Sequence, residues 1–148
     1  MKSKRLHVVV LAGGPSRERE VSLSSGRCVT RALQEAGHQV EMADITPEDL
    51  SALDRPADAF FVALHGAFGE DGGLQSIMDE RGLVYCGSDA EGCRRSIDKY
   101  LSKKIFEQDG LPTAPSALAE AAGDLAGLAA RWTPPVVVKP VTEGSSIG

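Results

Sequence analysis

The chain has 148 residues, of which 42% are hydrophobic and 25% charged, and its formal net charge is −5. This length fits one domain, or one domain plus part of another, and the composition is that of a globular protein. The acidic balance argues against a nucleic-acid binder, because neutralising phosphates requires a clustered basic face. No apolar run approaches the ~20 residues of a membrane span. The three cysteines form no CxxC pair, which indicates reduced thiols and a cytoplasmic location.

The first part of the chain predicts a strand, a helix and a second strand. Residues 6–12 are almost all apolar, as in a strand buried on both faces. Residues 22–37 show helical spacing, with Ser22 available as the N-cap and Gly37 as the residue after the last turn. Residues 38–45 alternate like a less buried strand.

The next segments repeat this alternation of strands and helices. Residues 58–66 predict a strand that ends in a glycine turn, 72–82 a short helix, and 83–88 a short strand. The order indicates an α/β domain of three layers with a parallel sheet. We place its boundary after Ser88, so that residues 1–88 form an N-terminal α/β domain.

The remaining residues, 89–148, predict an incomplete second domain. Residues 89–108 have a helical pattern in two pieces, and two prolines then interrupt it. The alanine-rich residues 117–132 predict a helix, and residues 134–140 predict a further strand.

Polar loops follow three of the predicted strands, and ligands of open parallel sheets bind beyond the carboxyl ends of the strands. The loop after the first strand places Glu18 and Glu20 ahead of a helix N-terminus. Either the carboxylates only stabilise the helix dipole, or one of them holds an amine. The two adjacent glycines, Gly13 and Gly14, match neither a GxGxxG fingerprint nor a P-loop.

The loop after the third strand begins with His65 and continues to Glu70 and Asp71. A lone histidine is usually structural. The alternative is that the imidazole hydrogen-bonds a carboxylate or shares a proton with one.

The third polar loop follows Lys139, whose compact ammonium suits a phosphate. Gly144, Ser145 and Ser146 could present backbone N–H groups to an anion, although glycine-serine loops also serve as flexible connectors. The order of strand, lysine and small residues favours phosphate binding.

Four motifs together carry a resemblance to a known family: LAGGPSREREVSLSSG, ALHGAFGEDGGLQ, GLVYCGSDAEGCRRSIDKYLSKKIFEQDGLPTAP and VVVKPVTEGSSIG. In this order they resemble D-alanine–D-alanine ligases, which are bacterial ATP-grasp enzymes. The resemblance covers nearly the whole chain apart from residues 117–132. It implies an N-terminal domain of the pre-ATP-grasp type, followed by the beginning of an ATP-grasp central domain.

The resemblance also implies roles for individual residues of the first half. Glu18 matches the glutamate that holds the ammonium group of the first D-alanine, and His65 matches the histidine beside that substrate. Pro15 departs from the polar residues common in the family, without consequence because it lies in a turn.

Nucleotide-binding roles follow from the same resemblance. Lys99 and Lys139 match the two lysines that contact the phosphates of ATP. Ser145 matches a serine that hydrogen-bonds near the glutamate. This match implies a catalytic role for Ser145 and for Glu18. Ser145 and Ser146 lie in the loop that closes over the phosphates.

The reaction implied is magnesium-dependent. The carboxylate of one D-alanine attacks the γ-phosphate of ATP, and the amine of a second attacks the acyl phosphate, which yields the dipeptide for peptidoglycan precursors. The adenine pocket and the magnesium ligands are expected beyond Gly148, so we expect an inactive fragment that dimerises through its N-terminal region. A D-lactate or D-serine acceptor, or a non-enzymatic module that binds a small ligand, stays open.

Overall fold

The computed structural model describes residues 4–132 and 135–144. The predicted site residues Ser145 and Ser146 therefore lie outside the described residues. The chain divides into two compact units, Met1–Arg94 and Arg95–Gly148. The predicted domain boundary after Ser88 stays a prediction.

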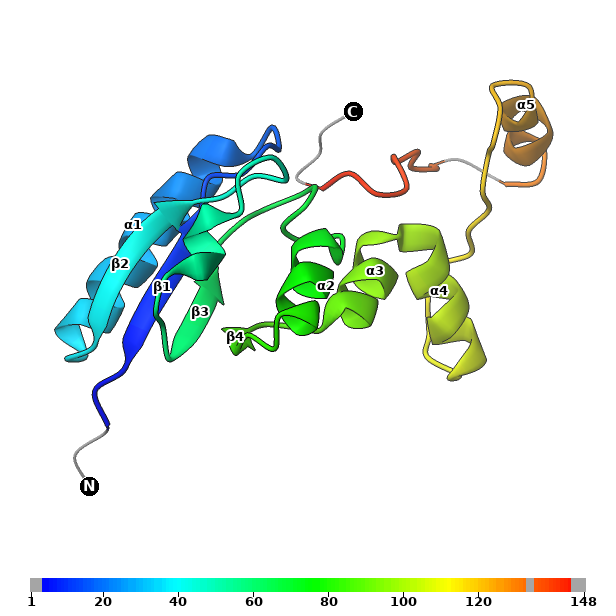
Figure 1. The fold of residues 1–148 in the computed structure, drawn as a ribbon. Coiled ribbons are helices and arrows are strands. Elements are labelled where there is room, and N and C mark those ends of the chain that lie inside the picture. The colour runs from blue at the N-terminus through cyan, green and yellow to red at the C-terminus, as the bar shows by residue number, and fades with distance from the viewer. Residues whose placement is uncertain (1–3, 133–134, 145–148) are drawn as a thin grey trace. The chain divides into compact units, whose positions relative to one another are not determined.

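The first unit contains a parallel sheet of four strands in the order β2-β1-β3-β4 (Figure 1). The strands are β1 His7–Ala12, β2 Gln39–Asp44, β3 Ala59–Val62 and β4 Tyr85–Cys86. In the central strand β1, Val10 pairs with Met42 on one side and with Phe61 on the other. Because all four strands run parallel, their carboxyl ends meet at one edge of the sheet.

Helices cover both faces of this sheet, which confirms the predicted three-layer α/β arrangement. On one face lies α1 (Arg19–Glu35), and on the other lie the 3-10 helix η1 (Ser51–Asp54) and α2 (Gly73–Glu80). Alternate residues of β1 enter the two cores, as the period of a strand requires. One core holds Val9, Leu11, Phe60, Leu74 and Met78, and the other holds Val8, Val10, Ala12 and Ala63 with Leu23, Val29 and Leu33 of α1.

Helix α1 has a different start from the one predicted. It begins at Arg19 rather than at Ser22, and Ser22 is a fully buried residue inside the helix. The assignment of Ser22 as the N-cap was therefore wrong, because its hydroxyl bonds to backbone groups at two strand ends instead. The predicted end is confirmed: Gly37 has φ +92°, and its N–H donates to the carbonyl of Gln34.

The strand β3 is shorter than the predicted residues 58–66: the Ala63 N–H still donates to the Leu11 carbonyl of β1, and the chain then forms the loop that carries His65. The two-piece helix prediction for residues 89–108 is confirmed by α3 (Ala90–Ile97) and α4 (Lys99–Gln108). Between them, the carboxylate of Asp98 caps α4 by accepting a 2.8 Å hydrogen bond from the Leu101 N–H.

Two predictions for the second unit were wrong. Only Asp124–Ala129 (α5) of the predicted helix 117–132 is helical. The residues just before α5 form a turn, in which the Asp124 carboxylate accepts hydrogen bonds from the N–H groups of Glu120 and Ala121. Residues 135–140 form no strand, and Val137 and Val138 are 77% and 76% exposed. A strand needs a neighbour for its backbone hydrogen bonds, and within the described part of the chain no strand pairs with this segment.

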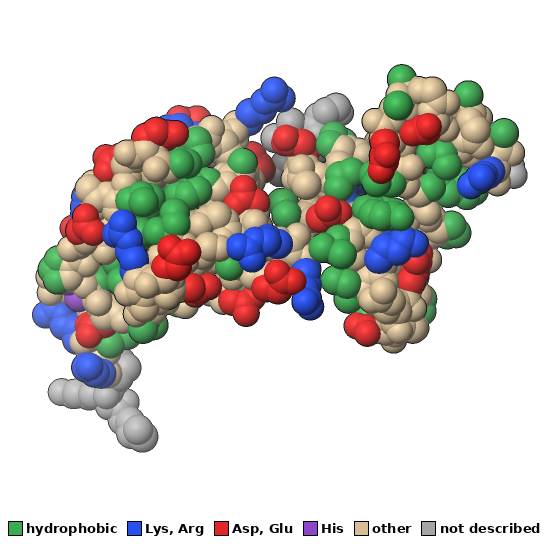
Figure 2. All heavy atoms as spheres, turned by 45° about the vertical axis from the view of Figure 1, so that its right-hand side comes forward, with side chains coloured by type: hydrophobic (Ala, Val, Ile, Leu, Met, Phe, Trp, Pro, Cys, Tyr) green, Lys and Arg blue, Asp and Glu red, His purple; other side chains and the backbone are tan. Residues whose placement is uncertain are grey.

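The surface carries charges of both signs. Figure 2 shows Lys and Arg side chains interspersed with Asp and Glu over the face in view. None of the helices in the described residues is long and apolar enough to span a membrane.

Candidate functional site

The carboxyl ends of β1 and β3 lie next to each other and are joined by a side chain of α1. The buried hydroxyl of Ser22 accepts a hydrogen bond from the Gly13 N–H and donates one to the Ala63 carbonyl, each 2.8 Å long. One serine thus fixes the start of both polar loops at this edge of the sheet.

The loop after β1 is held by its own chain rather than left open to a ligand. The Gly14 N–H donates to Asp44 Oδ1 over 3.0 Å, while Gly13 uses its N–H on Ser22. Both glycines have positive φ, +95° and +76°. The positive φ of Gly14 is strained for a residue with a side chain, and a Cβ there would also stand 2.7 Å from Leu64 Cδ2, so glycine is favoured at this position. Since both amides are engaged internally, they do not form a phosphate cradle.

Asp44, at the end of β2, anchors this loop to the first turn of α1. Its carboxylate pairs with the guanidinium of Arg19, which also donates to the Gly14 carbonyl over 3.2 Å. The Arg19 hydrogen bond, with those from the Gly14 and Ile45 N–H groups, lowers the pKa of Asp44 below its ordinary value. The same pair raises the pKa of Arg19.

Glu18 occupies the N-cap position of α1, but its carboxylate makes no capping hydrogen bond. Instead the carboxylate lies against the loop after β3, because a Cβ on Gly66 would stand 3.1 Å from Glu18 Oε2. Ser16 ties the two loops together: its Oγ accepts from the Glu18 N–H over 3.1 Å and donates to the His65 carbonyl over 2.6 Å. Glu18 and His65 therefore lie at the same edge of the sheet. Glu20 is exposed in the first turn of α1.

The imidazole of His65 lies between two polar side chains. Its Nε2 is 3.2 Å from the Ser25 hydroxyl of α1, and its Nδ1 is 3.6 Å from Glu70 Oε1. Glu70 is itself fixed, because its other oxygen accepts from the Gly66 N–H over 2.8 Å. The His65 side chain is 32% exposed, so one part of the ring remains accessible from solvent.

Asp71, which follows Glu70, has a structural role in the same loop. Its carboxylate accepts from the N–H groups of Phe68 and Gly73, both over 2.8 Å, and so closes the turn before α2. Phe68 has φ +70°, an uncommon conformation for a residue with a side chain, and its ring is buried in the core. The Asp71 hydrogen bonds thus hold the loop between Phe68 and Gly73, just after His65.

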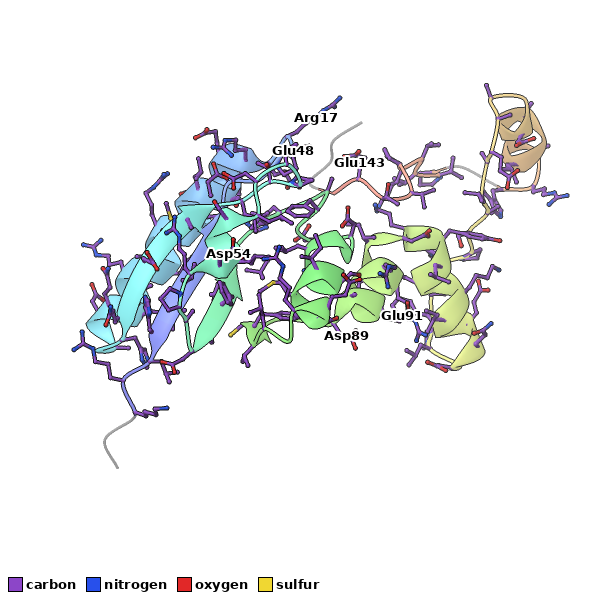
Figure 3. All side chains as sticks on the ribbon, viewed as in Figure 1. Arg17, Glu48, Asp54, Asp89, Glu91 and Glu143 are labelled. Carbon is purple, nitrogen blue, oxygen red and sulfur yellow. The ribbon has the colours of Figure 1, made fainter. Side chains whose placement is uncertain are left out.

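Sequence reasoning missed two residues of this site, Ser22 and Ser25. Ser25 follows Glu18 by two helical turns, so both lie on one face of α1. That spacing was the signal that could have found Ser25. Arg17, in contrast, projects outward from the loop between β1 and α1 (Figure 3).

The second unit places Lys99 against the segment that follows Lys139. Lys99 begins α4, its N–H donates to the Val141 carbonyl over 3.1 Å, and its ammonium donates to the carbonyls of Val141 and Glu143. Lys139 is exposed. The Lys99 ammonium therefore already has carbonyl partners in this segment, and the assignment of Lys99 and Lys139 to phosphate groups stays a prediction. Within residues 4–132 and 135–144, no group of three or more His, Cys, Asp or Glu could hold a metal ion.

The chain is 41% identical over 142 residues to the D-alanine–D-alanine ligase of Methylacidiphilum infernorum. This alignment covers 96% of the chain and 45% of that relative. The chain is homologous to the D-alanine–D-alanine ligase family. The crystal structure of the Bacillus anthracis D-alanine–D-alanine ligase is similar, with a TM-score of 0.73 and 31% identity over 97% of the chain and 48% of that structure. No family model matches the chain.

The chain is also similar to a second structure of the B. anthracis D-alanine–D-alanine ligase, which is complexed with ATP. The match covers 82% of the present chain and 45% of the solved one, with a TM-score of 0.64 and 29% identity. The chain therefore spans about half the length of the ligases it matches. The similarity to the first B. anthracis structure extends over both units, since 97% of the chain is covered.

Proposed function

We propose that the protein to which this chain contributes is an ATP-dependent D-alanine–D-alanine ligase of the cytoplasm, acting in peptidoglycan precursor synthesis. The observation that carries the proposal is the position of Glu18 and His65 on adjoining loops at the ligand edge of a parallel sheet. The identity of 41% to a ligase over 96% of the chain supports it.

In this proposal, Glu18 binds the ammonium group of the first D-alanine. A carboxylate that lies against the Gly66 backbone, on the loop beside His65, is a suitable partner for the ammonium group of a substrate. His65 lies beside the same substrate, on the loop that Ser16 joins to Glu18. The two residues together orient the first D-alanine at the sheet edge.

The phosphate groups of ATP are bound by Lys99 and Lys139, with the loop that contains Ser145 and Ser146 closing over them. The ATP-bound B. anthracis ligase supports the use of this nucleotide. Bound ATP would supply the phosphoryl group that activates one substrate carboxylate, and magnesium would neutralise the charge of the phosphates. The lysines contribute by neutralising phosphate charge and fixing its position, which is how proteins accelerate phosphoryl transfer.

We further propose that these 148 residues do not catalyse the reaction by themselves, because they align with less than half of the relative from M. infernorum. The magnesium ligands, the adenine pocket and most of the acceptor site are expected in segments that the relatives have beyond this alignment. A homodimer formed through the N-terminal unit is part of the same proposal.

A coupled assay tests the function directly. The 148-residue chain and a complete ligase, meaning this chain followed by the remaining family segments, are incubated with ATP, magnesium and D-alanine, D-lactate or D-serine. We expect phosphate release and D-alanyl-D-alanine from the complete ligase only. If the complete ligase instead joins D-alanine preferentially to D-lactate or D-serine, the proposed acceptor, D-alanine, would be wrong. Phosphate release by the 148-residue chain would refute its inactivity.

A further inference from the structure

The ring of His65 is held from two sides by residues of different elements. From α1, the hydroxyl of the half-buried Ser25 faces Nε2 at 3.2 Å. From the loop before α2, the Glu70 carboxylate faces Nδ1 at 3.6 Å. The two contacts meet opposite ends of the imidazole, so together they define its orientation.

The chemistry of these partners selects one protonated nitrogen. An ionised carboxylate only accepts hydrogen bonds, so the nitrogen that faces Glu70, Nδ1, carries the proton of the neutral ring. In that tautomer Nε2 holds a lone pair, and the Ser25 hydroxyl, 3.2 Å away, is placed to donate to it. A serine hydroxyl can rotate to donate, and which histidine nitrogen carries the proton is set by the partners of both.

We propose that Ser25 is a positioning residue that fixes the ring of His65 in its Nδ1–H form beside Glu18. The Gly66 N–H holds the other oxygen of Glu70, and Ser16 holds the His65 carbonyl, so the backbone around the ring is already fixed. Ser25 supplies the remaining constraint, on the ring itself. Its role is distinct from substrate contact, because it acts through His65.

Nitrogen chemical shifts of the histidine ring test this proposal in the 148-residue chain. Long-range ¹H–¹⁵N correlation spectra recorded at pH 8 distinguish a protonated ring nitrogen from an unprotonated one. We expect His65 to show unprotonated Nε2 and protonated Nδ1. In Ser25→Ala, the loss of one hydrogen bond should change the tautomer ratio by roughly 2- to 12-fold toward Nε2–H.

Two variants serve as controls. Ser24→Ala removes an exposed hydroxyl from the neighbouring position of α1 and should leave the His65 ratio unchanged. Ser25→Thr keeps a hydroxyl and should preserve the Nδ1–H form. A wild-type spectrum with protonated Nε2 would overturn the proposal whether or not any variant folds. A Ser25→Ala spectrum identical to that of Ser24→Ala would overturn it as well.

The kinetic consequence rests on the proposed ligase function. In the complete ligase, Ser25→Ala should raise the KM for D-alanine several-fold while changing kcat little, and Ser24→Ala should change neither. A wild-type complete ligase with no activity on D-alanine would refute the proposed function but leave the tautomer result intact. An active ligase in which Ser25→Ala leaves the KM unchanged would overturn the positioning role instead.

Discussion

Replacing Ser22 by alanine should destabilise the first unit more than any other serine replacement in α1. Ser22 is 0% exposed, and its hydroxyl joins the Gly13 N–H and the Ala63 carbonyl through two hydrogen bonds of 2.8 Å. In Ser22→Ala, both backbone groups lose this partner in a region that water does not reach, because Gly13 is buried and Ala63 is 5% exposed.

The expected loss in the free energy of unfolding is about 2 kcal/mol or more. A buried polar group without a partner costs about 1–3 kcal/mol, and two such groups are created. The higher helix propensity of alanine offsets roughly 0.5 kcal/mol of this. Since small domains have only about 5–15 kcal/mol of stability, the variant should still fold but with a clearly lower midpoint.

Urea unfolding monitored by far-UV circular dichroism measures this loss, with Ser24→Ala as the matched control. Ser24 is exposed on the same helix, so its replacement should change stability by less than about 0.5 kcal/mol. Hydrogen exchange provides a second readout, because the Gly13 amide should be protected in the wild type and exchange faster in Ser22→Ala. The reasoning would be refuted by a Ser22→Ala variant as stable as Ser24→Ala.

Three further predictions concern the core, the loop anchor and the thiols. Gly26→Ala should cost about 1–3 kcal/mol despite its better helix propensity, because the new Cβ would lie 2.5 Å from that of Ala12; a gain in urea midpoint would contradict this. Asp44→Asn should cost less than about 1 kcal/mol at pH 7, since the pair with Arg19 is partly exposed. Because Arg19 lowers the folded pKa of Asp44, this stabilisation is present above pH 4 and is lost as pH falls through the folded value. Unfolding at pH 7 and pH 3 should therefore show a smaller difference between wild type and variant at pH 3, and an equal difference would count against the pair. Burial, followed by the charge of Asp89, raises the pKa of Cys93, so at pH 8 a thiol reagent should modify it more slowly than the exposed Cys28; equal rates in single-cysteine variants would argue otherwise.

The sequence was sufficient to predict the layers of the first unit because its apolar pattern follows the geometry of the elements. Residues 6–12 are apolar on both sides, and β1 lies in the middle of the sheet with its side chains in both cores. The loops after β1 and β3 could also be assigned to one edge, since parallel strands end on the same side.

The partners of individual side chains could not be predicted in this way. Serine is a common residue type at N-caps, but the position of Ser22 inside α1 depends on where the ends of β1 and β3 lie. Residues 135–140 have the apolar pattern of a strand, but in the described residues no neighbouring strand pairs with them. Propensity is local, whereas these outcomes depend on contacts with distant segments.

The central claim is that the carboxylate of Glu18 binds the substrate amine, and Glu20 provides a control for it. Both residues lie at the start of α1, but Glu18 contacts the loop of His65 whereas Glu20 is exposed. The decisive measurement is the rate of D-alanyl-D-alanine synthesis by the complete ligase carrying Glu18→Gln or Glu20→Gln. Losing a charge-assisted contact of about 1.5–3 kcal/mol predicts a fall of roughly 10- to 150-fold in kcat/KM for Glu18→Gln and little change for Glu20→Gln. Equal activity of the two variants would contradict the claim.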